Sequence, residues 1–451
     1  MTNQTKHAVV MGGSVAGLLA AQVLSLHFDR VTVVERDDVA SAEGARKGVP
    51  QGRHLHVLLA AGFDSLQRTL PDFRERALAR GAIEVDVGNF GVLYLSGVLI
   101  AALESGKTSL MISRPAIESC IRERVLTRPN INVRSGCAVH SLLGDARAIT
   151  GVSIGSATHA QHEELTADLV VDATGRGTRL PGWLETLGLG RPREEVVRSN
   201  VSYATCMIGR KPDHLAGANA WVMTPLPPLT RWGAAQAVEG DRYIVTFTTY
   251  LGDRGPESYA EMIEYARALP FPGLYELLRV AEPQTEVSKM FDPESKRRHY
   301  ERMARFPSGL LVVGDALCSF NPAYGQGMTV AALEAEALDQ ALRAGTTGLS
   351  RRFFAAASKI VDAPWMLATG ADFQWPAVEG RRGIATGLIN TYIARVIKTA
   401  GRDAVVAERL LRVMHLLDAP QTLFAPAIVR RVLLTKPEMR LIPAEATLES
   451  A

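Results

Sequence analysis

The stretch HAVVMGGSVAGLLAAQVLSLHFDRVTVVERD, residues 7–37, decides the fold of this chain. Residues 7–11 are an apolar run typical of a buried strand, and a glycine-rich turn follows at 12–17. Residues 14–27 then carry apolar side chains at helical spacing, and residues 30–35 read as a second strand. Strand, turn, helix and strand in this order predict a parallel, right-handed βαβ unit.

The turn has the spacing of a dinucleotide-binding fingerprint, with a serine at the second glycine position. Gly12 permits the tight turn, the small Ser14 lets backbone N–H groups approach a pyrophosphate, and Gly17 lets helix and strand pack closely. Gly13 and Ala16 complete the predicted set, and the helix N-terminus adds partial positive charge. The alternative is a turn that only connects the strand to the helix.

An acidic residue, Glu35, ends the second strand 23 residues after Gly12. A carboxylate at this place can accept hydrogen bonds from the two hydroxyls of an adenosine ribose. Arg36 follows it and is counted among the predicted cofactor-binding residues. The alternative for Glu35 is a solvated carboxylate without a partner. Combined with the glycine turn, it favours a cofactor with an adenosine half.

A second motif begins with Gly314, Asp315 and Ala316 and continues with NPAYGQGM, residues 321–328. An aspartate at a strand end can bind a sugar or ribityl hydroxyl. A Pro/Gly loop that leads into a helix offers backbone donors and a positive dipole end, which suit the pyrimidine edge of a reduced flavin. The alternative is a turn capped by Asp315. The predicted cofactor-binding residues of this motif are Asp315, Pro322, Gly325, Gly327 and Met328. The two motifs together predict FAD rather than FMN.

Three segments resemble the FAD-dependent monooxygenases of the aromatic-hydroxylase superfamily: VVMGGSVAGLLAA with VVERD, DATGRGTRL at 172–180, and LLVVGDALCSFNPAYGQGM at 310–328. Within that superfamily, KGVPQGRHLH at 47–56 and the NPxYGxGM loop most resemble the bacterial polyether-ionophore epoxidases, distant relatives of squalene epoxidase. The resemblance covers roughly residues 7–335.

The resemblance implies an α/β (α+β) fold: a Rossmann-like FAD-binding domain of the GR2 type, an inserted mixed β-sheet substrate domain and a C-terminal helical region. It also implies that a flavin C4a-hydroperoxide delivers one oxygen atom, that Arg53 and Arg114 lie near the FAD, and that residues 172–177 lie near the second motif. The alternatives are a plain turn after a buried strand at 172–175 and a surface cation at Arg114.

Pattern changes along the chain predict the domain boundaries. The FAD-binding domain takes residues 1–195 and is completed by 301–350, a mixed-sheet substrate domain takes 196–300, and a helical region takes 351–451. Helices are expected at 54–68, 115–127, 327–344, 352–369, 383–400, 402–417 and 423–434. Four aromatic residues of the mixed sheet either line an apolar pocket or pack in the core: Tyr203, Trp221, Trp232 and Phe247.

Composition excludes several other classes. A formal net charge of +3 without a basic run gives no indication of a nucleic-acid partner. No stretch of 18 apolar residues occurs and the first residues lack the apolar region of a signal peptide, so a cytoplasmic protein without a transmembrane segment is expected. The four scattered cysteines are expected to be reduced thiols. His54 and His56 lack a third ligand nearby, and no metal site is predicted.

The expected function is an FAD-dependent monooxygenase that uses O₂ to epoxidise or hydroxylate an apolar small molecule, in specialised metabolism. Flavin halogenases of the same superfamily carry a WxWxIP segment and a catalytic lysine; no such segment occurs here, so halogenation is disfavoured. No second GxGxxG follows a strand, so NAD(P)H binds transiently or a separate flavin reductase supplies electrons. The alternatives are an FAD-dependent reductase or dehydrogenase of the geranylgeranyl-reductase type, and a non-catalytic flavin-binding or sensor protein.

Overall fold

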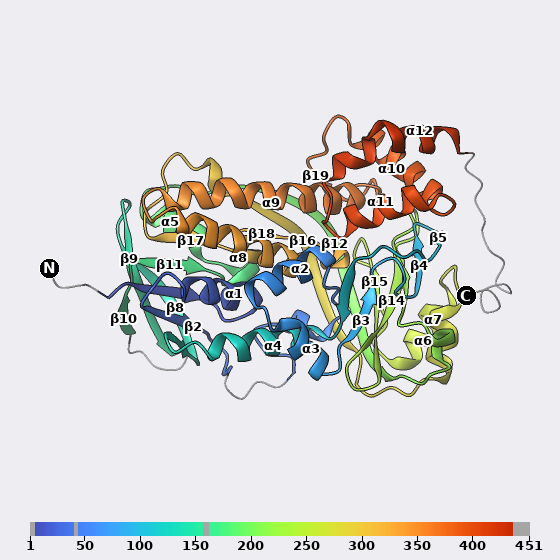
Figure 1. The fold of residues 1–451 in the computed structure, drawn as a ribbon, viewed down its shortest axis with the longest axis horizontal. Helices are drawn as coiled ribbons and strands as arrows, with labels where there is room; N and C mark the ends of the chain where they lie inside the picture. Colours follow the sequence, from blue (N-terminus) through green and yellow to red (C-terminus); the bar gives the residue numbers. More distant parts are fainter. Residues whose placement is uncertain (1–4, 40–43, 157–161, 436–451) are drawn as a thin grey trace.

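The computed structural model describes residues 5–39, 44–156 and 162–435. Two large sheets lie side by side along the molecule, with long helices across the first and a group of helices against the end of the second (Figure 1). The predicted α/β class is confirmed.

The first sheet has five parallel strands in the order β17-β11-β1-β2-β7. Its strands are β1 (His7–Met11), β2 (Arg30–Val34), β7 (Ile131–Arg134), β11 (Leu169–Asp172) and β17 (Leu310–Val312). β1, β11 and β17 are buried along their whole length, as expected of parallel strands written as apolar runs. The predicted βαβ unit is therefore present.

Helices pack around this sheet, and α1 lies between α8 and α4 (Figure 1). Their bounds are α1 (Val15–Leu24), α2 (Ala60–Thr69), α3 (Phe73–Ala79), α4 (Arg114–Leu126), α5 (Leu180–Thr186), α8 (Gly327–Arg343) and α9 (Leu349–Asp372). Two small antiparallel sheets flank the group. They are formed by β8 (Cys137–Gly144), β9 (Ile149–Ser156) and β10 (His162–Thr166), and by β3 (Ile83–Asp86) and β6 (Thr108–Met111).

The second large sheet has nine strands, mostly antiparallel, in the path β18-β16-β12-β15-β14-β13-β4-β5, with β19 paired to β12. Its strands are β4 (Val92–Leu95), β5 (Val98–Ile100), β12 (Arg193–Gly209), β13 (Ala220–Met223), β14 (Arg231–Val238), β15 (Arg242–Thr249), β16 (Ser288–His299), β18 (Cys318–Ser319) and β19 (Glu379–Gly380). α6 (Tyr259–Arg267) and α7 (Gly273–Val280) complete this part. Since β4 pairs with β13, residues 92–100 join this sheet rather than the first one. The domain division itself remains a prediction.

The helix predicted at 54–68 begins only at Ala60. A short 3-10 helix, η1 (Pro50–Arg53), precedes it, and the chain between them runs extended because two of its groups bind the nine-stranded sheet. The Nδ1 atom of His54 is hydrogen-bonded to Thr205 Oγ1 at 2.7 Å, and the Leu55 N–H donates to Thr246 Oγ1 at 3.1 Å. These tertiary bonds override the local helical pattern.

The C-terminal helices form a second hydrophobic core on the edge of the nine-stranded sheet. They are α10 (Thr386–Ala400), α11 (Ala404–Met414) and α12 (Pro426–Leu434), close to the predicted ranges. Val406 and Leu410 of α11 pack in this core with Leu93, Leu95 and Ile100 of β4 and β5. The last part of the predicted helical region, residues 436–451, lies outside the described residues. No helix in the described part of the chain combines the length and apolar character needed to span a bilayer.

Candidate FAD site

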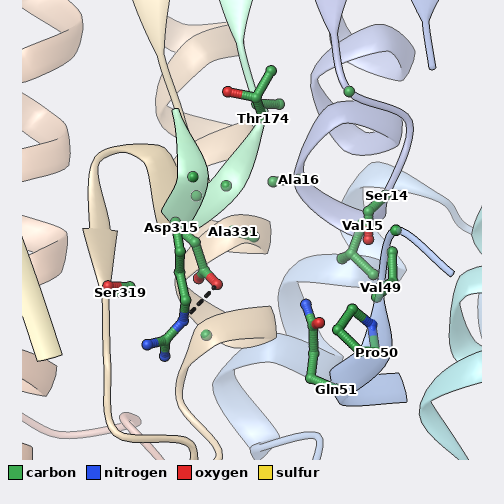
Figure 2. A pocket seen from close by; sticks show the side chains of 18 of the residues that line it. Ser14, Val15, Ala16, Val49, Pro50, Gln51, Thr174, Asp315, Ser319 and Ala331 are labelled. Atoms are coloured by element: carbon green, nitrogen blue, oxygen red, sulfur yellow. Dashed lines mark ion pairs between the residues drawn. The ribbon is translucent and has the colours of Figure 1, made fainter. Parts of the chain in front are cut away.

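A cavity of about 690 Å³ lies where the ends of the parallel strands meet the nine-stranded sheet. Its size is within the range of small-molecule sites. The walls come from the glycine turn, residues 34–36, 48–51, 137–139, 173–179, 290–296 and the 314–328 segment. Figure 2 shows Ser14, Val15 and Ala16 on one side of this space, Pro50 and Gln51 below, and Asp315 across from them.

The glycine turn has a conformation that other residues would not reproduce. Gly12 has φ +102°, and a Cβ on Gly17 would lie 1.9 Å from the carbonyl oxygen of Gly12. The turn delivers the N-terminus of α1 to the cavity, and no side chain caps that helix end. Uncapped N–H groups at a helix N-terminus are suited to a phosphate, so this cradle fits the pyrophosphate of a dinucleotide.

Glu35 is buried at the edge of the cavity, so it is not the solvated carboxylate of the alternative. Its Oε2 atom accepts a hydrogen bond from the Gly13 N–H at 2.7 Å, and its Oε1 atom accepts one from the Asp37 N–H at 3.0 Å. A guanidinium nitrogen of Arg46 lies 3.4 Å from Oε2. The carboxylate is therefore fixed beside the turn, and ribose binding by it remains a prediction.

Arg46 and Glu118 form a buried ionic cluster under the glycine turn. The sequence did not indicate this cluster. Arg46 Nε donates to Glu118 Oε1 at 2.7 Å, and its NH2 donates to the Gly13 carbonyl at 3.2 Å. Ser14 Oγ donates to Glu118 Oε2 at 2.8 Å. Arg46 lies in a polar loop without a motif. The available signal was that Arg114, directly before the helix predicted at 115–127, stands four residues ahead of Glu118.

Of the predicted arginines, Arg114 and Arg36 line the cavity and Arg53 does not. Ser113 caps α4 by accepting a hydrogen bond from the Ala116 N–H at 3.3 Å, which places Arg114 in the first turn of the helix. Its guanidinium donates to Ser14 Oγ at 3.0 Å, and burial lowers its pKa against the opposing effect of Glu118. Arg53 ends η1 with its side chain exposed and outside the cavity lining, and a role near the FAD remains a prediction for it.

Asp315 lines the cavity with its side chain one third exposed and pairs with Arg176 at 3.6 Å (Figure 2, dashed line). Arg176 also pairs with Asp292 at 2.6 Å, and burial raises the pKa of Asp292 to about 6. Asp172 is fully buried and accepts hydrogen bonds from Thr174 and Thr178, and burial raises its pKa. The 172–177 segment thus lies beside the second motif, where the resemblance put it.

The loop from Asn321 to Met328 completes the wall opposite the glycine turn. Pro322, Gly325, Gly327 and Met328 all line the cavity. Gly325 has φ +64°, a left-handed conformation that favours glycine, and it turns the chain into α8. α8 likewise has no side-chain cap at its N-terminus, so a second set of backbone donors faces the cavity.

The four aromatic residues predicted to bind substrate pack in the hydrophobic core and do not line this cavity. Trp221 lies against α7, where a Cβ on Gly273 would come within 2.4 Å of its Nε1 atom, and Phe247 tilts against Tyr265 at 4.6 Å. Trp232 is buried as well, whereas Tyr203 donates from its hydroxyl to Asn321 Oδ1. α6 and α7 cover the face of the sheet that carries Trp221 and Phe247, whereas Tyr203 and Trp232 lie on the opposite face, where Tyr203 contacts His54 and Asn321. Substrate binding by the four residues remains a prediction. The apolar side chains that line the cavity include Trp183, Met290, Phe291 and Phe320.

Of the two histidines, His54 is buried and His56 lines the cavity. His56 Nδ1 donates to the His54 carbonyl at 2.9 Å, and burial together with Arg114 lowers the pKa of His56 to about 3. His56 is therefore neutral at physiological pH. Among the described residues, no group of His, Cys, Asp and Glu has the arrangement of a metal site. All four cysteines are free, and Cys137 lies at the cavity wall.

Comparison with known proteins identifies this arrangement. Residues 5–352 match the family model described as FAD binding domain. A Mycobacterium tuberculosis protein, Rv3254, is 33% identical over 437 residues, which cover 92% of this chain and 91% of that protein.

Solved structures share the fold at low sequence identity. The flavin-dependent brominase Bmp2 superimposes with a TM-score of 0.65 at 15% identity, over 95% of this chain and 98% of that one. The p-nitrophenol 4-monooxygenase PnpA from Pseudomonas putida gives a TM-score of 0.65 at 18% identity, over 92% and 99%. The chain belongs to the FAD-binding-domain family and has the fold of the flavin-dependent monooxygenases.

Proposed function

We propose that this chain is an FAD-dependent monooxygenase that inserts one atom of O₂ into an apolar small molecule, by epoxidation or hydroxylation, in specialised metabolism. When bound, FAD supplies the activation of oxygen, and the protein supplies binding, orientation and exclusion of water. The observation that carries the proposal is a single cavity walled by both cofactor motifs and continued by apolar side chains of the nine-stranded sheet.

Each wall of the cavity has a defined part in this proposal. The N-terminus of α1 and Arg114 bind the pyrophosphate, and Glu35 accepts hydrogen bonds from the adenosine ribose. Asp315 binds a ribityl hydroxyl. The N–H groups of residues 326–328 at the N-terminus of α8 would bind the pyrimidine edge of the flavin ring, and Met328 and Phe320 would keep water from it.

The chemistry of the lining favours an alkene over a phenol as substrate. Every carboxylate and imidazole that lines the cavity already has a hydrogen-bonding or ionic partner among the described residues. Asp292 and Asp315 share Arg176, and the pKa of His56, lowered to about 3 by burial and Arg114, makes its imidazole a weak base. Deprotonating a phenol needs an available base, whereas epoxidation needs none. The likeness of residues 47–56 to the polyether epoxidases agrees with this, since Gln51 and His56 line the cavity.

The electron source is either NAD(P)H in transient contact or a separate flavin reductase. Anaerobic mixing of the FAD-bound protein with NADPH or NADH separates the two. Bleaching of the flavin absorbance within the time of turnover indicates direct reduction, and a slow reaction accelerated by an added flavin reductase indicates the partner.

The deciding experiment uses labelled dioxygen with candidate alkenes and electron-rich aromatic compounds. One labelled atom is expected in the product and the other in water, and mass spectrometry with NMR separates an epoxide from a phenol. A product that gains two hydrogens and no label would support the reductase alternative. A halogenated product would support the activity that Bmp2's name records, and FAD binding without turnover of any substrate would favour a flavin-binding protein.

A further inference from the structure

A buried polar network lies directly behind the Asn321–Gly325 loop, and apart from Asn321 its residues do not line the cavity. It joins Asn321 and Tyr324 of the loop to Tyr250 at the end of β15 and to Asp372, the last residue of α9. Asn321 is itself a cavity residue, so the network touches the flavin site through one side chain. α9 thereby takes part in the architecture of the site.

The amide of Asn321 has all of its hydrogen-bonding capacity in use. Its Oδ1 accepts from the Ala323 N–H and the Tyr203 hydroxyl, both at 3.0 Å. Its Nδ2 donates to Asp372 Oδ1 at 2.9 Å and to the Tyr250 hydroxyl at 3.0 Å. Because four partners fix the amide, the orientation of the loop depends on the groups that hold Nδ2.

The two oxygen atoms of the Asp372 carboxyl differ in their hydrogen bonds. Oδ1 receives hydrogen bonds from Asn321 Nδ2, from the Tyr324 hydroxyl at 2.8 Å and from the Tyr250 hydroxyl at 3.2 Å. Oδ2 is buried and has no partner among the described residues, and no ion pair there includes Asp372. A buried carboxylate without a cation is costly, so this group can carry a proton near neutral pH. Burial raises its pKa to about 7, and the tyrosine and asparagine hydrogen bonds act in the opposite direction.

We propose that Asp372 is a positioning residue of the flavin site: through Asn321 and Tyr324 it holds the 321–325 loop against the cavity, and gain or loss of its proton changes how the loop is held. An ionised Asp372 accepts from all three donors. A protonated one must orient its own O–H and weakens the hold on Asn321 and Tyr324. The inference rests on FAD occupying the cavity and not on which substrate is oxidised.

Other charged or titratable groups lie around Asp372. Tyr250, Tyr324 and Tyr203 are buried phenols whose pKa values burial raises well above the usual value, so they stay neutral. Asp292 of β16 adds repulsion and pairs with Arg176. Burial raises its pKa to about 6, so it titrates at lower pH than Asp372, and it is present in both the wild type and Asp372→Asn, so the change that the variant loses belongs to Asp372. Arg382 donates to the carbonyls of residues 373, 375, 376 and 378 at the end of α9.

The test is a pH titration of the visible spectrum of the FAD-bound protein between pH 5 and 9, without substrate. The wild-type spectrum is expected to change with a midpoint near pH 7. Asp372→Asn should bind FAD, lose this pH-dependent change and resemble the wild type at low pH, because the amide imitates the neutral acid. A wild-type spectrum constant over this range, or a variant that keeps the change, would overturn the proposal.

Tyrosine variants keep the proposal testable if Asp372→Asn does not fold. Tyr324→Phe removes a hydrogen bond that stabilises the carboxylate, so the midpoint should rise by about one pH unit. Tyr265→Phe is the matched control, because its buried hydroxyl donates to the Thr248 carbonyl and not to the network, and its midpoint should equal the wild-type value. An unmoved midpoint in Tyr324→Phe would overturn the proposal. Neither experiment involves oxygen insertion, so a failed labelling experiment would leave these results intact.

Discussion

The two loops that face each other across the cavity are held in opposite ways. The glycine turn at 12–17 is supported by paired charges, with Arg46 between Glu118 and Glu35. The 321–325 loop is supported by hydroxyl and amide groups around one unpaired carboxyl, Asp372. Paired guanidinium and carboxylate groups keep their charges through neutral pH, whereas a lone buried carboxyl does not. The 321–325 loop is therefore the one that we expect to respond to pH near neutrality.

Arg46→Met is the change that should disturb the first loop most. It leaves Glu118 with less compensation and releases the Gly13 carbonyl, and breaking a buried pair in this way costs about 3–5 kcal/mol. Urea denaturation of the variant should give a correspondingly smaller free energy of unfolding, and FAD should be lost on gel filtration. Arg68→Met is the control, since the Arg68–Glu336 pair is exposed and should contribute less than about 1 kcal/mol. Equal losses in the two variants would contradict the buried-cluster account.

Asp372, which supports the 321–325 loop, should make the free energy of unfolding depend on pH. Between the unfolded pKa of about 4 and the folded value of about 7, the native protein holds a proton on Asp372 that the unfolded chain has released. Stability therefore falls as pH rises through this window, by up to about 4 kcal/mol in all, and is level above it.

Asp372→Asn should remove that contribution, so its unfolding free energy should depend less steeply on pH between 4 and 7 than that of the wild type. Glu334, whose pKa burial raises to about 8, has the same sign and is present in both proteins, so the difference isolates Asp372. Parallel curves for the two proteins, measured by urea unfolding at several pH values, would show that Asp372 does not hold the proton.

Gly17→Ala should weaken FAD binding although it changes no charged group. The added Cβ would meet the Gly12 carbonyl oxygen, so the turn must shift, at a cost of about 1–3 kcal/mol. FAD affinity should fall by up to about a hundredfold in fluorescence titration. Gly387→Ala in α10 is the matched control, because a Cβ there meets nothing within 4 Å and no left-handed conformation is involved. Unchanged FAD affinity in Gly17→Ala would show that the glycine turn does not bind the cofactor.

What the sequence could predict depends on how far apart the partners lie. The roles of Gly12 and Gly17 follow from a pattern of six residues, and Asp315 from its place after a strand, so both motifs reached the cavity. The bonds from Arg46 to Glu118 and from Asn321 to Asp372 join residues 72 and 51 positions apart, and no local pattern connects them.

The mixed sheet shows a different limit. Its strands were recognisable from their composition, but Trp221 and Phe247 could face either a pocket or the core, because both settings favour large aromatic side chains. Only the position of α6 and α7 decides it. The start of α2 was missed for the same reason, since the bonds of His54 and Leu55 to the sheet are tertiary.

Arg53→Ala should have the smallest effect on FAD affinity. It tests whether a residue takes part in FAD binding merely because it follows the cavity-lining residues 48–51 in the sequence. Arg53 directly follows Gln51 and Gly52, yet its side chain is exposed at the end of η1 and outside the cavity lining. FAD affinity should change by less than about threefold, since an exposed cation off the site adds only a screened interaction. Arg114→Ala is the comparison, because Arg114 lines the cavity and bonds Ser14, and its loss removes a charge-assisted donor worth about 1.5–3 kcal/mol, or roughly ten- to a hundredfold in affinity. Isothermal titration of the two apoproteins with FAD gives both values. Equal losses of affinity in Arg53→Ala and Arg114→Ala would contradict this expectation. They would mean that η1 reorganises when FAD binds and brings Arg53 to the phosphates. The pyrophosphate side of the site would then include Arg53 as well as Arg114.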